Sequence, residues 1–205
     1  DWSFFHAVND LAGRSRLLDD VMVDWAQVGP LVLGMIVAAA WFVLPGDRRD
    51  VYPRRLALRA VLAACLALGI AQLIAHEWMR QRPYVAGAAH LLVAPSSDPS
   101  FPSDHAVGAF ALATPLLVDQ RARWFGVLGV VGAALLGVAR VFIVTHFPSD
   151  VLVGALLGAS TALMLVWLAK IMDSCCPLVW MPVRLASRMT DSVFLRLREL
   201  IPIRT

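Results

Sequence analysis

The chain has 205 residues, of which 59% are hydrophobic, and its mean hydropathy is +0.69. This composition excludes an ordinary water-soluble domain and predicts an all-α integral membrane protein. The net charge is only +3, and no basic stripe interleaved with aromatic residues occurs, so we expect no nucleic-acid partner. The cysteines, Cys65, Cys175 and Cys176, form no CxxC spacing, which argues against a zinc site or a disulfide framework.

The first 20 residues mix apolar and polar side chains near helical spacing. This pattern predicts an interfacial helix that lies on the membrane and ends at Gly13, with a frayed terminus as the alternative. No short apolar core of a cleaved signal peptide is expected there. Apolar spans follow at about 21–44, 56–78, 104–118, 125–144 and 151–172. We therefore expect a bundle of five or six transmembrane helices with flanking interfacial helices.

Residues 1–205 are expected to form one membrane domain, with an interfacial segment at 1–20, a transmembrane core at 21–172 and a cytoplasmic tail at 173–205. The tail predicts a basic amphipathic helix from about Pro182 to Ile201. Basic residues gather in this tail and in the loops at 46–55 and 119–123, and the positive-inside tendency places that side in the cytoplasm. The loops at 79–103 and 144–150 then face outward.

The outward loop after the fourth span contains Arg140, His146 and Asp150. His146 and Asp150 are four residues apart, the separation that places two side chains on one face of a helical turn. Asp150 could therefore orient the His146 ring and leave its other nitrogen free to attack or to accept a proton. Arg140 could bind phosphate oxygens in the same pocket. Taken alone, this spacing often occurs by chance, and the simpler interpretation is a polar loop between two helices.

A second polar stretch has the same make-up, since Phe-Pro-Ser-Asp occurs at 101–104 and again at 147–150, each time just before an apolar helix. Helix starts of this kind favour an anion, so we expect Ser103 and the adjacent His105 to face the same site. Arg80 and Arg82, after the second span, are either snorkelling cations or a phosphate clamp. Their outward position, where no orientation signal requires basic residues, favours the clamp. The other histidines are expected to be structural: His6, His76 and His90.

The chain resembles the type-2 phosphatidic acid phosphatase superfamily in three ordered motifs, Arg82-Pro83, Pro102-Ser103-Asp104-His105 and Arg140-x5-His146-x3-Asp150. The resemblance covers roughly residues 70–160. Further passages are similar to its bacterial undecaprenyl pyrophosphate phosphatase branch, namely Asn9-Asp-Leu-Ala-Gly13, Gly29-Pro30 and the aspartate form of the second motif at Asp104.

This resemblance implies hydrolysis of undecaprenyl diphosphate to undecaprenyl phosphate and inorganic phosphate, without metal or cofactor, through a phosphohistidine intermediate. His146 would be the nucleophile, Asp150 its orienting group and His105 the acid that protonates the leaving group. The substrate-binding residues would be Arg80, Arg82, Ser103, Asp104 and Arg140. The resemblance also implies a bacterial cytoplasmic membrane, with the active site facing the periplasm and polyprenyl and membrane lipids as partners.

Three positions depart from the broad family pattern. Ala75 stands where the family has a lysine, and Arg80 is the candidate to replace its charge. Asp104 stands where the family has glycine, so this carboxylate either serves the helix start or holds a cation that bridges the diphosphate. Ala139 replaces a common serine, which removes one polar contact.

Other functions remain open at this level. A phosphatidylglycerophosphate or lipid A phosphatase of the same superfamily is the alternative within the class, whereas the expected membrane spans argue against a vanadate-dependent haloperoxidase. A non-catalytic lipid-phosphate binding or transport protein would need the arginines but not the histidines. A metallophosphatase would use Asp104, His105, His146 and Asp150 as ligands. The sequence does not indicate an oligomeric state.

Overall fold

The computed structural model of the protein describes residues 1–44, 52–85, 87 and 91–175. Within these ranges the regular structure is entirely helical, which confirms the all-α prediction. The helices are α1 (Trp2–Asn9), α2 (Arg16–Val43), α3 (Tyr52–Glu77), α4 (Asp104–Val118), α5 (Arg123–Phe142) and α6 (Pro148–Cys175).

The expected membrane spans are present, although their ends differ from the apolar runs. Four helices, α2, α3, α5 and α6, are long and apolar enough to cross a membrane, and α4 is a shorter apolar helix of 15 residues. Helix α3 begins at Tyr52 rather than Leu56, and α2 begins at Arg16 rather than Val21. The apolar run marks only the segment that fits the hydrocarbon core of the bilayer. A helix forms all its backbone hydrogen bonds internally and can therefore continue into the polar interface.

The N-terminal segment is divided between two helices. Helix α1 ends at Asn9, and a turn with Gly13 in the left-handed conformation (φ +80°) leads into α2. Residues 16–20, which we expected in the interfacial segment, therefore form the first turn of α2. The expected tail helix at 182–201 and the residue His90 lie outside the described residues.

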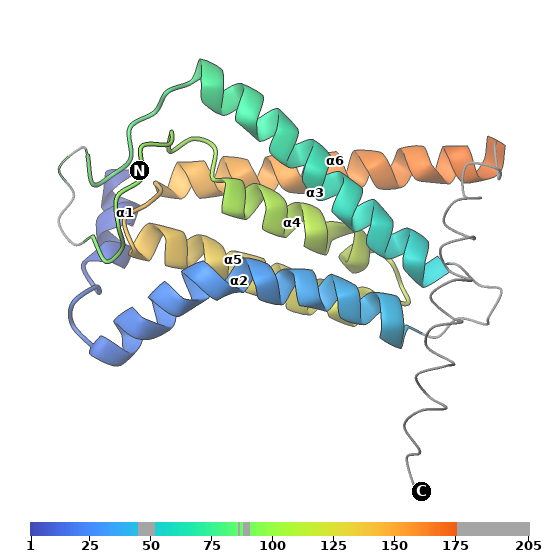
Figure 1. Ribbon diagram of the computed structural model, residues 1–205, viewed down its shortest axis with the longest axis horizontal. Coiled ribbons are helices and arrows are strands. Elements are labelled where there is room, and N and C mark those ends of the chain that lie inside the picture. The colour runs from blue at the N-terminus through green and yellow to red at the C-terminus, as the bar shows by residue number, and fades with distance from the viewer. Residues whose placement is uncertain (45–51, 86, 88–90, 176–205) are drawn as a thin grey trace, which may run out of the picture.

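Helix α4 lies at the centre of the bundle and packs against α3, α5 and α6 (Figure 1). Glycines on its neighbours allow a close approach of backbones. A Cβ atom at Gly158 of α6 would lie 2.2 Å from the carbonyl oxygen of Val107, and one at Gly126 of α5 would lie 2.1 Å from the amide nitrogen of Leu117. Small residues serve the same purpose wherever membrane helices pack closely. Backbone contact on two sides therefore fixes α4, including its polar first turn.

The outer surface of the bundle suits a lipid environment. Large apolar side chains are exposed along the long helices, among them Leu31, Leu62, Leu128 and Leu156. Exposed tryptophans lie near opposite ends of the bundle, Trp78 just after α3 and Trp124 at the start of α5. Tryptophan commonly occupies the two interfaces of a membrane. The chain is a multi-pass membrane protein.

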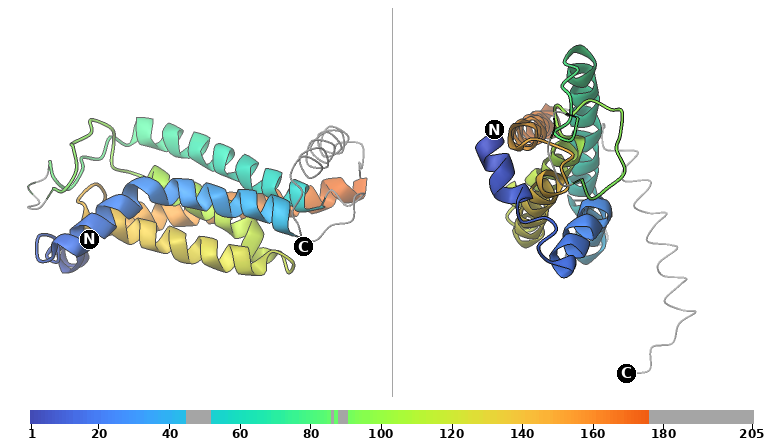
Figure 2. Two further views of the ribbon diagram at one scale, coloured as in Figure 1. Left: turned by 60° about the horizontal axis from the view of Figure 1, so that its bottom comes forward. Right: turned by 90° about the vertical axis from the view of Figure 1, so that its left-hand side faces the viewer.

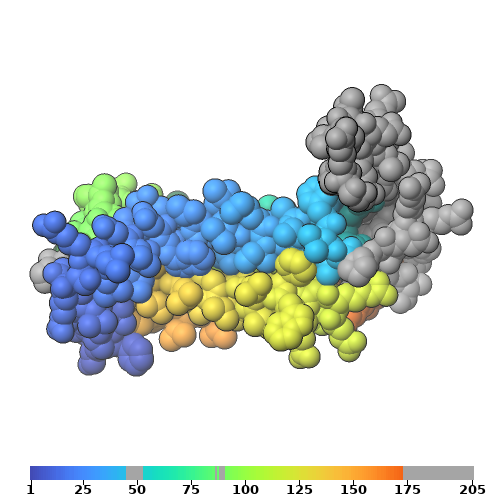
Figure 3. Space-filling view, turned by 90° about the horizontal axis from the view of Figure 1, so that it is seen from below, coloured from blue at the N-terminus to red at the C-terminus, as the bar shows by residue number. Residues whose placement is uncertain are grey.

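The polar motifs meet at one end of the bundle, because α3 and α5 end there while α4 and α6 begin there (Figure 1). Helix α1 packs against α5 at this end (Figure 2), and α2 lies beside α5 along one face (Figure 3). The core shared by α2 and α3 lies near the opposite end, where Val37, Ala40 and Leu44 meet Leu56, Ala57 and Ala60. From there α2 and α3 diverge toward the polar end (Figures 1 and 2).

Candidate active site

A cavity of about 620 Å³ lies at the polar end of the bundle. The residues expected at the site that line it are Arg82, Asp104, His105, Arg140 and His146. They come from three segments that are far apart in the sequence. The expected residues that do not line it are Arg80, Ser103 and Asp150. The structure thus brings both predicted catalytic histidines, two arginines and Asp104 to one cavity. The other three expected residues do not line this cavity.

His146 lies in the turn between α5 and α6 and is only 3% exposed. Its Nδ1 atom is 2.8 Å from the carbonyl oxygen of Ser100. A carbonyl oxygen can only accept a hydrogen bond, so Nδ1 carries the proton. In the neutral ring, Nε2 is then left unprotonated with its lone pair available, which is the tautomer that a nucleophilic imidazole needs.

The surroundings of this ring favour its neutral form. Burial is the main cause that holds the pKa of His146 well below its ordinary value near 6.5, and the positive charges of Arg140 and Arg82 add to it. The hydrogen bond to Ser100 opposes the shift. The ring is therefore neutral at physiological pH, and its free nitrogen is not blocked by a proton.

Asp150 lies in the first turn of α6 and is fully buried. Its Oδ2 atom is 4.0 Å from Nδ1 of His146, too far for the direct hydrogen bond that we expected. The same oxygen instead accepts hydrogen bonds from the Ser100 hydroxyl and from the backbone amide of Phe147. Asp150 thus acts on the ring through Ser100, whose hydroxyl it binds and whose carbonyl holds the imidazole.

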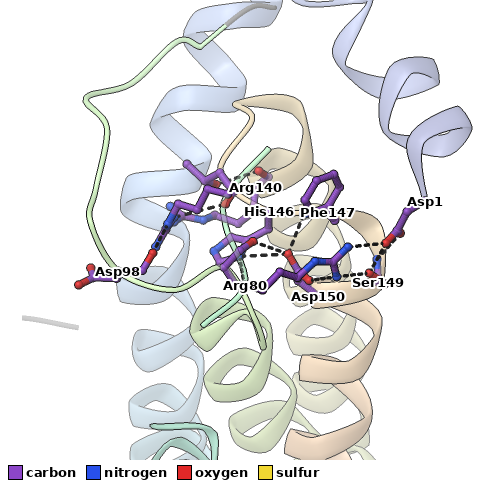
Figure 4. Close-up of polar contacts among 11 residues, drawn as sticks. Asp1, Arg80, Asp98, Arg140, His146, Phe147, Ser149 and Asp150 are labelled. Carbon is purple, nitrogen blue, oxygen red and sulfur yellow. Dashed lines mark hydrogen bonds and ion pairs between the residues drawn. The ribbon is translucent and has the colours of Figure 1, made fainter. Parts of the chain in front are cut away.

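The structure corrects the expected place of Arg80. Its Nη1 atom donates to Oδ1 of Asp150 at 2.6 Å and to the hydroxyl of Ser149 at 2.8 Å, and its Nη2 donates to the Asp1 carboxylate at 2.9 Å (Figure 4). The guanidinium also lies 4.4 Å above the centroid of the Phe147 ring. Arg80 does not line the cavity, because the buried carboxylate of Asp150 requires a counter-ion and takes this one.

Arg82 and Arg140 are the two guanidinium groups that face the cavity. Arg82 is 8% exposed, and it donates from Nε to the Asp98 carbonyl at 2.9 Å and from Nη1 to the Thr145 carbonyl at 3.3 Å. The buried Nε of Arg140 has no hydrogen-bond partner among the described residues. Two guanidinium groups on one wall form a strongly positive site that suits phosphate oxygens.

The turn that carries His146 is built on the backbone of Arg140. The amides of Thr145 and His146 both donate to the Arg140 carbonyl oxygen, at 3.1 and 3.3 Å, and the Thr145 hydroxyl donates to it at 2.8 Å. Val144 adopts a left-handed conformation (φ 67°), which is unfavourable for a β-branched residue. Strain of this kind persists only where surrounding contacts impose it. Here the strained turn brings His146 back to the last turn of α5, where its amide bonds to the Arg140 carbonyl.

The first turn of α4 supplies His105 and Asp104 to the cavity and Ser103 behind it. The Asp104 Oδ2 atom accepts a hydrogen bond from Nε2 of Gln72 at 2.7 Å, and its buried Oδ1 has no partner among the described residues. Ser103 is fully buried, and its amide donates to the Asp150 carbonyl at 3.1 Å. Its hydroxyl also lacks a partner in the described part of the chain. Ser103 therefore ties α4 to α6, and it does not line the cavity.

Several residues of the site were not predicted from the sequence. Ser100 bridges Asp150 and His146, and Gln27, Gln72 and Thr145 line the cavity. The amides of Gln27 and Gln72 were the available signal, since an uncharged polar side chain within an apolar span usually faces protein or a water-filled cavity. The role of Ser100 depends on its backbone carbonyl, which no sequence pattern reveals.

The remaining histidines that the structure describes lie away from the cavity. His6 of α1 lies 3.6 Å from the carboxylate of Asp10, the residue that follows this helix, and His76 does not line the cavity. Within the described residues, no group of three or more His, Cys, Asp or Glu side chains is arranged to hold a metal ion.

Comparisons with known proteins agree on one family. A family model described as the PAP2 superfamily matches residues 56–173. The undecaprenyl-diphosphatase BcrC of Bacillus subtilis is 32% identical over 152 residues, which are 74% of this chain and 75% of the relative. The decaprenylphosphoryl-5-phosphoribose phosphatase of Mycobacterium tuberculosis is 37% identical over 133 residues, 65% of this chain and 67% of the relative. The crystal structure of Aquifex aeolicus LpxE shares the fold, with a TM-score of 0.67, 24% identity, and coverage of 81% of this chain and 94% of that one.

Proposed function

Since the chain belongs to the PAP2 superfamily of phosphatases, we propose that it removes the terminal phosphate from undecaprenyl diphosphate and releases undecaprenyl phosphate. The observation that carries this proposal is the shared cavity. Two arginines and two histidines from three distant segments face one hollow at the end of a membrane bundle. The similarity to undecaprenyl-diphosphatase BcrC supports the choice of lipid.

His146 is the nucleophile in this proposal. Its unprotonated Nε2 attacks the terminal phosphorus, a nitrogen–phosphorus bond forms, and the bond from phosphorus to the bridging oxygen breaks. Arg82 and Arg140 stabilise the charge on the phosphoryl oxygens during this step. The leaving group is undecaprenyl phosphate. His105 takes up a proton when the anionic diphosphate binds beside it, and it donates that proton to the leaving oxygen.

The second step releases inorganic phosphate. A water molecule attacks the phosphorus of the phosphohistidine, the nitrogen–phosphorus bond breaks, and His146 returns to its starting form. His105, which is unprotonated after the first step, accepts the proton of this water. The reaction as written needs no metal ion or cofactor, because the two guanidinium groups neutralise the phosphate charge.

Asp150, Ser100 and Arg80 act as positioning residues behind this chemistry. The Arg80 guanidinium compensates the buried charge of Asp150, and Asp150 fixes the hydroxyl of Ser100. The Ser100 carbonyl then holds the His146 ring in the reactive tautomer. This chain of contacts supports a positioning role for Arg80 behind the nucleophile, in place of the phosphate contact expected from the sequence.

The lipid tail leaves the cavity between α2 and α3 in our proposal. These helices share a core only toward the other end of the bundle, and they diverge toward the cavity (Figure 1). Gln27 of α2 and Gln72 of α3 are exposed residues on the cavity wall. A polyprenyl chain could therefore lie in the bilayer between the two helices while its diphosphate reaches the arginines.

We further propose that the cavity faces the periplasm across a bacterial cytoplasmic membrane. The basic residues Arg54, Arg55, Arg121 and Arg123 lie at the end of the bundle opposite the cavity. The positive-inside rule places that end in the cytoplasm. Undecaprenyl diphosphate would then be hydrolysed at the outer leaflet.

A lipid phosphomonoesterase is the second candidate function. The similarity to the decaprenylphosphoryl-5-phosphoribose phosphatase favours it, because the name of that relative describes a phosphate on a sugar carried by a polyprenyl lipid. Both reactions would use the same nucleophile and the same arginines, so the cavity alone does not separate them.

Purified protein tested against a panel of lipids decides between these functions. The panel contains undecaprenyl diphosphate, phosphatidylglycerophosphate, phosphatidate, lipid A and a polyprenylphosphoryl phosphoribose, with released phosphate measured in excess chelator. We expect the highest kcat/KM for undecaprenyl diphosphate. The His146→Ala variant should release none, and His6→Ala, which changes an exposed histidine away from the cavity, should behave as wild type. A higher kcat/KM for a monoester would replace the substrate assignment, and no release by wild type would indicate a binding protein.

A further inference from the structure

A second polar cavity, of about 530 Å³, lies at the end of the bundle opposite the histidines. It is lined by residues of α3, α4 and α6 and of the turn after α4: Leu56, Arg59, Pro115, Val118, Asp119, Gln120, Arg121, Val166 and Lys170. None of these residues belongs to the catalytic cavity. The proposed hydrolysis makes no use of this second hollow.

The different lengths of the helices create this cavity. Helix α4 has 15 residues and is therefore about 22 Å long, whereas α3 has 26 residues and α6 has 28. Since α3 ends and α4 and α6 begin at the histidine end, the longer helices extend past the end of α4 at the opposite end (Figure 1). The polar turn after α4 thus forms the floor of a recess whose walls are α3 and α6.

The charges on this recess are arranged for an anion. Arg59 comes from α3, Arg121 from the turn and Lys170 from α6, so three separate elements each contribute one cation to a single hollow. Among the described residues that line the recess, Asp119 is the acidic one, and its Oδ1 accepts the backbone amides of Arg121 at 2.9 Å and Ala122 at 3.2 Å. The described lining thus contains three basic side chains and one acidic side chain.

The walls of the recess are apolar where they continue into the membrane. Leu56, Pro115, Val118 and Val166 line it beside the charged groups. Beyond it, the outer surfaces of α3 and α6 expose large apolar side chains, including Leu62 and Leu163. A ligand that fits must therefore combine a charged phosphate group with a hydrocarbon part. Basic pockets between transmembrane helices commonly bind anionic lipid headgroups in this way.

We propose that this recess binds the phosphate headgroup of an anionic membrane phospholipid, in the leaflet opposite the catalytic cavity. Arg59 and Lys170 contact the headgroup from the two walls, and Arg121 contacts it from the floor. The acyl chains lie against the exposed apolar surfaces of α3 and α6. The bound lipid would link the end of α3 to the end of α6 at a level that α4 does not reach.

Native mass spectrometry of the full chain in detergent tests this site, with phosphatidylglycerol and phosphatidylcholine added at equal concentrations. We expect wild type to bind phosphatidylglycerol in preference. Arg59→Gln and Lys170→Gln should each weaken that binding about fivefold, because one charge contributes roughly 1 kcal/mol near a membrane surface. The matched control is Arg123→Gln, which removes an exposed arginine at the same end that does not line the recess. It should leave binding unchanged.

The same variants distinguish a specific site from a general attraction of anionic lipid to this end of the bundle. Their phosphatase activity and melting temperature without added lipid should match wild type, which verifies folding. Equal weakening by Arg123→Gln would show the general attraction and overturn the proposal. The proposal also fails if Lys170→Gln binds as wild type does. Retention of inorganic phosphate without any preference for phosphatidylglycerol would show an ion site, and would likewise overturn the lipid assignment.

Discussion

The Nδ1 atom of His146 lies 2.8 Å from the carbonyl oxygen of Ser100, and the hydroxyl of the same serine donates to Asp150. One residue therefore connects the carboxylate to the imidazole. The carboxylate and the ring do not touch directly, since Oδ2 of Asp150 is 4.0 Å from Nδ1. The reactive tautomer thus depends on how firmly the backbone at residue 100 is held.

Ser100→Ala keeps the carbonyl but removes the hydroxyl that Asp150 binds. We expect kcat to fall about tenfold, because a hydrogen bond to a charged group is worth roughly 1.5–3 kcal/mol and part of that loss should reach the ring. KM should change little, since Ser100 does not line the cavity. The control is Ser160→Ala, whose hydroxyl bonds only within α6 to the Leu157 carbonyl. Equal rates for Ser100→Ala and wild type would refute the relay through this serine.

Arg80→Gln and Arg82→Gln should differ in their effect on KM. Arg80→Gln leaves the buried Asp150 without its counter-ion, so kcat should fall about tenfold or more while KM stays near wild type. Arg82→Gln removes a guanidinium from the cavity itself, which binds the phosphoryl oxygens before and during the reaction, so KM should rise and kcat should fall.

Rescue distinguishes positioning by Arg80 from a merely structural effect. Arg80→Lys retains the positive charge beside Asp150 and should recover part of kcat, with a melting temperature close to that of Arg80→Gln. If Arg80→Gln instead raised KM as strongly as Arg82→Gln does, Arg80 would be a substrate-binding residue and our assignment would be wrong.

The close approach of α4 and α6 should be sensitive to a single methyl group. Gly158→Ala would place Cβ 2.2 Å from the Val107 carbonyl, so the helices must separate. We expect a loss of about 1–3 kcal/mol of stability and a lower kcat, because α4 carries His105. Gly34→Ala is the matched control on α2, where, apart from the helix's own backbone and the chain neighbours, no atom of the described residues lies within 4 Å of the new Cβ. Thermal unfolding and activity check both, and a harmless Gly158→Ala would contradict the packing described.

The pH dependence should reflect the lowered pKa of His146. The free ring remains neutral well below pH 6.5, so the acidic limb of kcat/KM that belongs to this ring should also lie below 6.5. The free energy of unfolding should also fall as the pH is lowered. The unfolded ring binds a proton as the pH falls through about 6.5 while the folded ring does not, so acidification favours unfolding.

The variant His146→Gln isolates this contribution to stability. The decrease in melting temperature between about pH 7 and pH 5 should be smaller in His146→Gln than in wild type, because the glutamine does not titrate. An identical decrease in both proteins would show that the ring does not resist protonation in the folded state.

Much of the fold could be predicted from the sequence because apolar runs and helix starts are local signals. The helices follow in the expected order. The two Phe-Pro-Ser-Asp stretches anticipated the start of α4, two residues after Pro102, and the start of α6 at Pro148 itself. Span ends were less predictable, as the early start of α3 at Tyr52 shows. Hydropathy does not show how far a helix continues into the polar interface, because a helix forms its own backbone hydrogen bonds there as well.

Five of the residues that line the cavity were expected from the sequence, but the contacts that place the other expected residues elsewhere were not. Arg82, His105, Arg140 and His146 meet in one cavity because alternate spans return their ends to the same side. Arg80 is two residues from Arg82, yet its guanidinium binds Asp150 behind the wall. The ion pair with a carboxylate 70 residues away decides where the Arg80 side chain lies, and no local sequence pattern indicates that pair.

The central claim is that His146 forms a covalent bond to phosphorus, and a rapid-quench experiment tests it directly. Wild-type protein is mixed with undecaprenyl diphosphate labelled with 32P in the terminal phosphate, and quenched protein is analysed for bound label. We predict label on His146 that is lost in acid and kept in alkali, and none on His146→Gln. Release of phosphate at the wild-type rate with no protein-bound label at any time, or equal labelling of the glutamine variant, would contradict the account.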